Sequence, residues 1–198
     1  MYIFKYPEFA QALYESLNAD PFYVAMLQPL SNDANSKADA LIRYLDYSMA
    51  EAETYGKLFI PEHHQYGVSI WTKPLTPDLE LKRNAEKKAF IKHYMGNESL
   101  SIYTTITSFM SAQTEGLIPD DAWYLSILGV TPQFQGKGLG TGLVSGVLQE
   151  TDKCSTFTYL ETFNAASINF YKKLGYEISR RIEEPVTQSP YWILVRGL

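Results

Sequence analysis

Cysteine is nearly absent from this sequence of 198 residues, in which Cys154 stands alone. No disulfide can therefore form within the chain, and metal sites built on paired cysteines are excluded. Long hydrophobic runs are also missing, since no uncharged apolar stretch approaches the roughly 20 residues that a membrane-spanning helix needs. The opening residues, MYIFKYPEF, lack the basic run and apolar stretch of a signal peptide. We therefore expect a cytoplasmic protein with no membrane partner.

Positive charge is scarce as well. The sequence has 17 Lys and Arg residues against 22 Asp and Glu residues, which gives a formal net charge of −5. Because binding to a nucleic-acid backbone calls for a basic face, no nucleic-acid partner is expected. The acidic balance instead suits a cationic substrate such as an amine. The length and a hydrophobic content of 45% predict one globular domain, residues 1–198.

Helix signals dominate the first part of the chain. Residues 2–5 predict a short strand, and Pro7 fits the first turn of a helix that extends to about residue 18. A longer helix is expected to begin at its N-cap Ser36 and to end near Gly56.

Two further strands are predicted at residues 57–61 and 66–71, joined by a turn that contains His63 and His64. The two histidines are adjacent rather than at the spacing of metal ligands. We therefore expect a solvated turn and no metal site.

A charged helix is predicted at residues 78–94, with Lys87 in a basic cluster that we expect on a solvated face. Residues 99–114 are ambiguous, because their Thr and Ile content favours a strand. Ile102, Ile106 and Phe109, however, fall at helical spacing, and we expect a helix.

Strand and helix signals alternate in the last third of the chain. The continuous apolar run WYLSILGV predicts a buried strand at Trp123–Val130. A glycine-rich loop, QGKGLG, follows, and then a helix with one apolar face. The remaining predicted elements are a strand at Thr158–Thr162, a helix at 166–174 closed by Gly175, and an antiparallel pair at 177–182 and 191–195.

A strand, a glycine-rich loop and a helix in this order form an arrangement that binds anions, because free N–H groups and the helix dipole meet at the loop. A P-loop would need Lys followed by Ser or Thr after its last glycine, but Lys137 lies between two glycines. A dinucleotide-binding fold would need a third glycine where Thr141 stands, and its glycines would follow the strand directly. Neither alternative fits.

The segment VTPQFQGKGLG, residues 130–140, closely resembles the acetyl-CoA pyrophosphate loop of GNAT acetyltransferases. The pattern of that loop is Gln or Arg, two residues, Gly, any residue, then Gly or Ala, and Gln135, Gly138 and Gly140 occupy these places. A second motif, NAASINFYKKLGY at residues 164–176, resembles the family's C-terminal signature, in which Asn precedes a helix ending Phe-Tyr-x-x-Leu-Gly-Phe. The two motifs follow one another in the family's order.

The specific resemblance covers residues 123–182, and within the family WYLSILGV, QGKGLG, YLET and FY resemble the puromycin N-acetyltransferase-like branch. It implies an α/β fold with a mixed, mostly antiparallel central sheet, a splayed parallel strand pair and helices on both faces. It also implies an acetyl-CoA-binding core at residues 122–198. Residues 1–121 would then be the variable, acceptor-binding part, with a helical insert at about 74–121.

Acetyl-CoA is the implied acyl donor, and no metal is implied. Its pantetheine arm would lie between the splayed strands and pair with the backbone of Leu128–Val130, where an N–H would polarise the thioester carbonyl. Backbone N–H groups of the loop would bind the pyrophosphate. The residues that the resemblance predicts to bind the donor are Leu128, Gly129, Val130, Gln135, Gly136, Lys137, Gly138, Leu139, Gly140, Thr141, Asn164 and Tyr171.

Two residues are predicted to be catalytic. Tyr171 matches the family's general acid, which protonates the coenzyme A thiolate; a packing role beside Phe170 is the alternative. The expected general base is Glu161, since the strand before the loop offers only Tyr124 and Ser126 and lacks the Glu or His of many relatives. A carboxylate in an apolar strand is unusual unless it is paired or functional. A salt bridge, a solvent-facing position and a water relay to another carboxylate remain the alternatives.

The predicted function is transfer of acetyl from acetyl-CoA to a primary amine of a small molecule, by a monomer or homodimer. Two alternatives stay open, namely acetylation of a protein N-terminus or lysine, and acyl-CoA sensing without turnover. We expect the helices in residues 22–55 and the insert to wall the acceptor pocket. A closed aromatic pocket would favour a small amine, and an open groove would favour a peptide.

Overall fold

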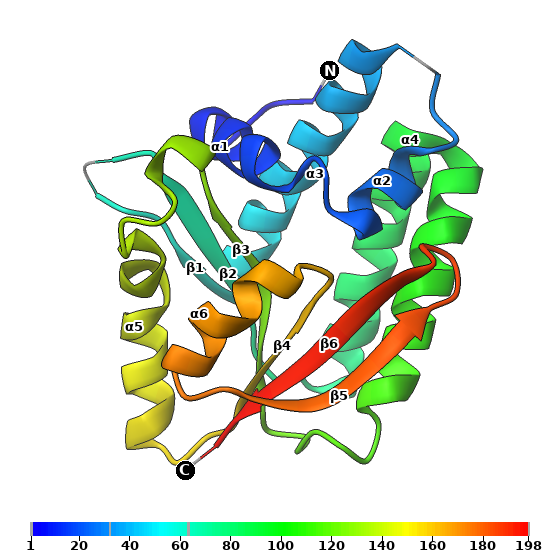
Figure 1. Ribbon diagram of the computed structural model, residues 1–198. Helices are drawn as coiled ribbons and strands as arrows, with labels where there is room; N and C mark the ends of the chain where they lie inside the picture. The colour runs from blue at the N-terminus through cyan, green and yellow to red at the C-terminus, as the bar shows by residue number, and fades with distance from the viewer. Residues whose placement is uncertain (1, 32, 63, 198) are drawn as a thin grey trace.

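The central sheet joins six strands in the order β1-β2-β3-β4-β6-β5 (Figure 1) in a computed structural model that describes residues 2–31, 33–62 and 64–197. The strands are β1 (Gly56–Phe59), β2 (Gly67–Thr72), β3 (Trp123–Val130), β4 (Thr158–Thr162), β5 (Glu177–Glu184) and β6 (Ser189–Arg196). Only β3 and β4 run parallel; the other neighbouring pairs in this described sheet are antiparallel. The predicted mixed, mostly antiparallel sheet with one parallel pair is confirmed.

Helices cover both faces of this sheet, as predicted. They are α1 (Pro7–Leu17), α2 (Pro21–Leu27), α3 (Ala34–Tyr55), α4 (Pro77–Thr114), α5 (Leu139–Lys153) and α6 (Ile168–Lys173), with short 3₁₀ turns at Pro132–Phe134 and Ala165–Ser167. None of the helices in the described ranges has both the length and the apolar character needed to cross a membrane.

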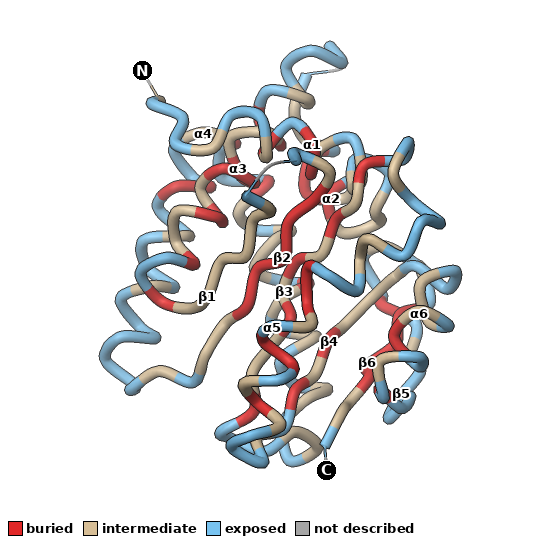
Figure 2. Tube along the Cα trace, turned by 90° about the vertical axis from the view of Figure 1, so that its left-hand side faces the viewer, coloured by how far each residue is buried: buried red, intermediate tan, exposed pale blue. Residues whose placement is uncertain are grey.

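Two hydrophobic cores lie on opposite faces of the sheet, because successive strand residues point to opposite sides. The first core joins α1, α3 and α4 to β2 and β3, and includes Leu13, Leu45, Val68, Ile91 and Ile127. The second joins α5 and α6 to the middle of the sheet, and includes Leu125, Val144, Leu160, Tyr171 and Trp192. Figure 2 shows the buried positions gathered on the central strands and on the inner side of α5. A residue's place along a strand therefore decides which group of helices it meets.

The ambiguous segment at residues 99–114 is helical, as predicted, and belongs to the 38-residue helix α4 together with the charged stretch before it. Gly96 interrupts the helix with φ of 86°, a backbone conformation that favours glycine. Ile106 is fully buried, which accounts for its place in the helical pattern. The long hairpin of β5 and β6 reaches α4, where Arg180 Nη1 donates to the carbonyl oxygen of Gln113 at 3.0 Å.

Two local predictions near the N-terminus are wrong. No strand forms at residues 2–5, because the buried carboxylate of Asp46, and not a neighbouring strand, accepts the Lys5 N–H at 3.1 Å. It accepts from the Tyr2 hydroxyl at 2.7 Å and from the Tyr6 N–H at 2.6 Å. The helix expected to start at Ser36 is capped by Asp33 instead. His63 lies outside the described residues.

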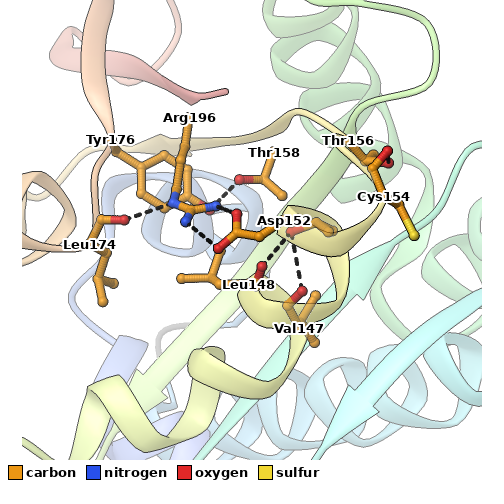
Figure 3. Close-up of polar contacts among 10 residues, drawn as sticks. Val147, Leu148, Asp152, Cys154, Thr156, Thr158, Leu174, Tyr176 and Arg196 are labelled. Atoms are coloured by element: carbon orange, nitrogen blue, oxygen red, sulfur yellow. Dashed lines mark hydrogen bonds and ion pairs between the residues drawn. The ribbon is translucent and has the colours of Figure 1, made fainter. Parts of the chain in front are cut away.

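The end of β6 is bound to α5, which follows the glycine-rich loop, and to the end of α6, which lies within the second motif (Figure 3). Arg196 Nε donates to the carbonyl oxygen of Leu174, just after α6, at 2.8 Å. Its Nη2 donates to Asp152 Oδ2, near the end of α5, at 2.8 Å. Beside this ion pair, Thr158 Oγ1 bonds to the Tyr176 hydroxyl at 2.9 Å. One side chain thereby fixes both α5 and α6 relative to the sheet.

Candidate active site

The parallel strands β3 and β4 separate part-way along their length. They pair from Trp123 with Thr158 to Leu125 with Leu160, whereas β3 continues to Val130. The register of β2 on β3 also shifts at this point, so that Ser126 forms a bulge. Bulges bend a strand and often lie next to active sites. The edge of β3 that faces β4 is consequently left without a strand partner over its last residues, where the pantetheine arm is predicted to lie.

The glycine-rich loop turns between β3 and α5 through two left-handed residues. Gly136 has φ of 73° and Gly138, the N-cap of α5, has φ of 77°. The N–H groups of residues 136–140 find no acceptor among the described residues, whereas those of Gln135 and Thr141 donate to Pro132 and Gly138. Five successive open N–H groups at the start of a helix fit the pyrophosphate of the predicted donor.

Side chains around this loop fix its position. Gln135 Nε2 donates to the carbonyl oxygen of Val130 at 2.8 Å, which ties the loop to the end of β3. A Cβ on Gly140 would lie 3.2 Å from the ring of Phe170, so glycine lets α5 approach α6. Lys137 is exposed and lies 5.4 Å from the ring centroid of Phe134, free to meet a phosphate.

A cavity of about 990 Å³ borders the gap between β3 and β4. Its lining includes the predicted residues Leu128, Glu161 and Tyr171, whereas the glycine-rich loop is not part of it. Glu161 comes from the face that α4 covers, and Tyr171 belongs to the core on the α5 and α6 face. The fold thus brings the two predicted catalytic residues from opposite faces of the sheet to one cavity.

Glu161 is held among tyrosine rings. Tyr124 and Tyr159, on β3 and β4, stack with ring centroids 4.7 Å apart beside it. Burial raises the pKa of the Glu161 carboxyl to about 7, against a smaller lowering by the hydroxyls of Tyr124 and Tyr191. Glu161 Oε1 is buried and makes no hydrogen bond of good geometry within the described residues. Among the residues that the structure describes, no cation forms the salt bridge that was an alternative for this carboxylate, and its pKa suits a general base near neutral pH.

Tyr171 is buried on α6, where its ring meets the edges of Phe170 and Tyr176 at centroid distances of 5.1 and 6.1 Å. Burial raises the pKa of its hydroxyl well above the ordinary value, and Tyr176 and the carboxylate of Asp20 raise it further. The hydroxyl therefore keeps its proton at neutral pH, as a proton donor must. Asn164 lies in the turn before α6, where its Oδ1 accepts from the Ala166 N–H at 3.0 Å. Its amide nitrogen is the part left to meet a ligand.

Asp20 lines the same cavity and was missed as a site residue. Its Oδ1 accepts the N–H of Phe22 at 2.9 Å, which caps α2. Burial raises the pKa of this carboxyl to about 6, while the bond from Phe22 lowers it. The sequence does carry a signal for this residue, since Asp before Pro is a common helix start. In the described residues, no group of three or more His, Cys, Asp and Glu side chains is placed to hold a metal ion.

Part of the chain is similar to a known protein domain. Residues 105–178 match an acetyltransferase (GNAT) domain, over a span that contains β3, the loop, α5, β4 and α6. The chain is an acyltransferase with the GNAT fold. Acetyltransferases of this class use acetyl-CoA as the acetyl donor, and the open N–H groups and the free edge of β3 fit such a ligand.

Solved structures share this GNAT fold along nearly the whole chain. An agmatine N-acetyltransferase is 16% identical with a TM-score of 0.63, over 98% of this chain and 95% of that one. A polyamine N-acetyltransferase from Drosophila melanogaster is 18% identical with a TM-score of 0.62, over 96% and 93%. A structure described as histone acetyltransferase HPA2 and related acetyltransferase, from Corynebacterium glutamicum, is 18% identical with a TM-score of 0.64, over 97% and 90%.

The left-handed turn of the loop provides a test of donor binding. We expect Gly138→Ala to weaken acetyl-CoA binding about tenfold, since alanine disfavours positive φ by roughly 1–2 kcal/mol and the loop must regain that conformation on binding. Gly146→Ala is the matched control, because Gly146 is an exposed residue inside α5 where alanine is tolerated. Isothermal titration with acetyl-CoA measures both affinities. Equal affinities of the two variants would show that the loop conformation does not govern binding.

Proposed function

We propose that the protein transfers the acetyl group of acetyl-CoA to a primary amine of a small molecule. The observation that carries the proposal is the single cavity that reaches both Glu161 and Tyr171 through the gap between β3 and β4. Its walls include several aromatic side chains, among them Phe22, Tyr23 and Tyr44. Rings of this kind suit a small amine better than an extended peptide. Among the structures that share the fold, two are described as agmatine and polyamine N-acetyltransferases.

The two faces of the sheet would have separate tasks. Residues 122–198 would hold acetyl-CoA on the α5 and α6 side, with its pyrophosphate on the glycine-rich loop and its thioester beside Leu128. Residues 1–121 would supply the walls of the acceptor site through α2, α3 and α4. The amine nitrogen and the thioester carbonyl would then meet in the gap between β3 and β4, which shortens the path between the reacting atoms.

Each catalytic group has one proton to move in this proposal. Glu161 accepts one proton from the neutral amine as the nitrogen forms its bond to the acetyl carbon. A backbone N–H on the free edge of β3 stabilises the negative charge on the carbonyl oxygen. The carbon–sulfur bond breaks, and Tyr171 donates its proton to the departing thiolate. The products are an N-acetylated amine and coenzyme A.

Release of free thiol from acetyl-CoA tests the function directly. We expect turnover with small primary amines and little or none with basic peptides, measured with a thiol reagent across matched acceptor concentrations. Preferred turnover of peptides, at N-termini or lysines, would replace this proposal with a protein acetyltransferase. Tight binding of acetyl-CoA without turnover of any acceptor would indicate an acyl-CoA sensor. The resemblance to the puromycin N-acetyltransferase-like branch makes aminonucleosides a natural part of the panel.

A further inference from the structure

The cavity also reaches a largely buried ion pair between α3 and α4. Glu51 of α3 and Lys87 of α4 both line the cavity, and Lys87 Nζ lies 2.6 Å from Glu51 Oε2. The two side chains are only 12% and 17% exposed. Lys87 therefore does not lie on the solvated helix face that its charged neighbours predicted.

One carboxylate oxygen of this ion pair has no hydrogen-bond partner among the described residues. Glu51 Oε1 is buried and has no hydrogen-bond partner within the described residues, although Oε2 is paired. Buried acceptors without a donor are rare in native proteins, and each calls for an explanation. Lys87 is already engaged, since its Nζ meets Glu51 and lies 5.5 Å from the centroid of the Tyr44 ring. The unmet need at Glu51 Oε1 is therefore for a hydrogen-bond donor.

Aromatic rings border the part of the cavity that holds the ion pair and continue toward Glu161. Tyr23 and Tyr44 meet edge to face at a centroid distance of 5.9 Å, and Phe22 and Tyr103 do so at 6.0 Å. Tyr23 is also close enough to Tyr124, beside Glu161, to raise the pKa of that hydroxyl, although burial has the larger effect. This wall would suit the methylene chain of an elongated ligand.

We propose that Glu51 is a specificity-determining residue, whose free oxygen accepts a hydrogen bond from a second donor group at the far end of the acceptor. The inference rests on the proposed function and names its substrate class: primary amines that carry a hydroxyl or a second amino group at the end opposite the reacting nitrogen. A carboxylate placed directly against Glu51 Oε1 is disfavoured, because it sets an acceptor against an acceptor.

Three acceptors of equal chain length test this class, namely an alkylamine, an amino alcohol and a diamine. We expect kcat/KM for the better of the two bifunctional amines to exceed that for the alkylamine roughly tenfold or more, because a hydrogen bond to a charged group is strong. In Glu51→Gln that advantage is expected to shrink severalfold, with kcat/KM for the alkylamine nearly unchanged. The double variant Glu51→Gln with Lys87→Met removes both charges and guards against instability from an unpaired lysine.

Glu150→Gln is the matched control, since Glu150 pairs with Lys57 outside the cavity and should keep the full preference. The inference is overturned if wild type treats the three acceptors alike, or if Glu51→Gln and the double variant lower all three equally. Ligand-induced shifts of Tm separate it from the proposed function. A diamine or amino alcohol that stabilises wild type but not the Glu51 variants, without any turnover, supports this recognition while the transferase proposal fails.

Discussion

Glu161→Gln is expected to lower kcat for acetyl transfer by roughly 10²–10⁴-fold, the usual contribution of a positioned general base. Glutamine has nearly the same shape but cannot accept a proton. Glu177→Gln is the matched control, because Glu177 is an exposed glutamate at the start of β5. Steady-state kinetics with a saturating amine measures the difference. A Glu161 variant that keeps wild-type kcat would leave the water relay to another carboxylate as the route of the proton.

The pH dependence of kcat should reflect the ionisation of the Glu161 carboxyl. Because the pKa of Glu161 is about 7 and the base must be deprotonated, kcat is expected to rise with pH through about 7 in the wild type. The residual activity of Glu161→Gln should lack this rise. A rise that persists in the variant with the same midpoint would assign the ionisation to another group, and Asp20, with a pKa of about 6, is the first to examine.

The same substitution should stabilise the fold while it removes activity. The pKa of Glu161 is higher in the folded state than its ordinary value of 4.5, so stability falls as pH rises from about 4.5 to 7. Above pH 7 the full cost of the buried charge, on the order of 3 kcal/mol, is present. Glu161→Gln should therefore have a higher Tm than wild type at pH 8 and a similar one near pH 4.5. Thermal unfolding at both pH values measures this.

Tyr171→Phe is expected to lower kcat by roughly 10²–10⁴-fold with little change in the affinity for acetyl-CoA, because it removes a proton donor and keeps the ring. Steady-state turnover and isothermal titration with acetyl-CoA separate the two effects. If Tyr171 served only as a packing residue beside Phe170, phenylalanine would preserve kcat. That result would remove Tyr171 from the mechanism.

Tyr176→Phe is the control for this experiment. Tyr176 belongs to the same core as Tyr171, but it bonds to Thr158 and does not line the cavity. Its variant should lose about 1 kcal/mol of stability with the hydrogen bond and keep its kcat. A loss of kcat in both tyrosine variants would point to disturbance of the core and not to proton transfer.

Structural features that depend on residues close together in the sequence could be predicted from the amino-acid order. The glycines of the loop permit the positive φ found at Gly136 and Gly138, and the apolar run at Trp123–Val130 favours a strand with buried side chains, so both were recognisable without a fold. Residues 2–5 were predicted wrongly because the carboxylate of Asp46, distant in sequence, accepts the Lys5 N–H in place of a neighbouring strand. Lys87 was also predicted wrongly, because its charged neighbours indicated a solvated face whereas its partner Glu51 is distant in sequence.

The sequence by itself determined the class of the protein, because the loop, the helix after it and the second motif form through interactions between near neighbours. It also identified Glu161 and Tyr171 as the catalytic candidates. Only the tertiary structure decided that these two residues, from opposite faces of the sheet, border one cavity, and that Asp20, Glu51 and Lys87 line it as well. The burial of these side chains, and the lack of a hydrogen-bond partner for Glu51 Oε1, depend on packing between elements far apart in the chain. Residue order alone does not specify that packing.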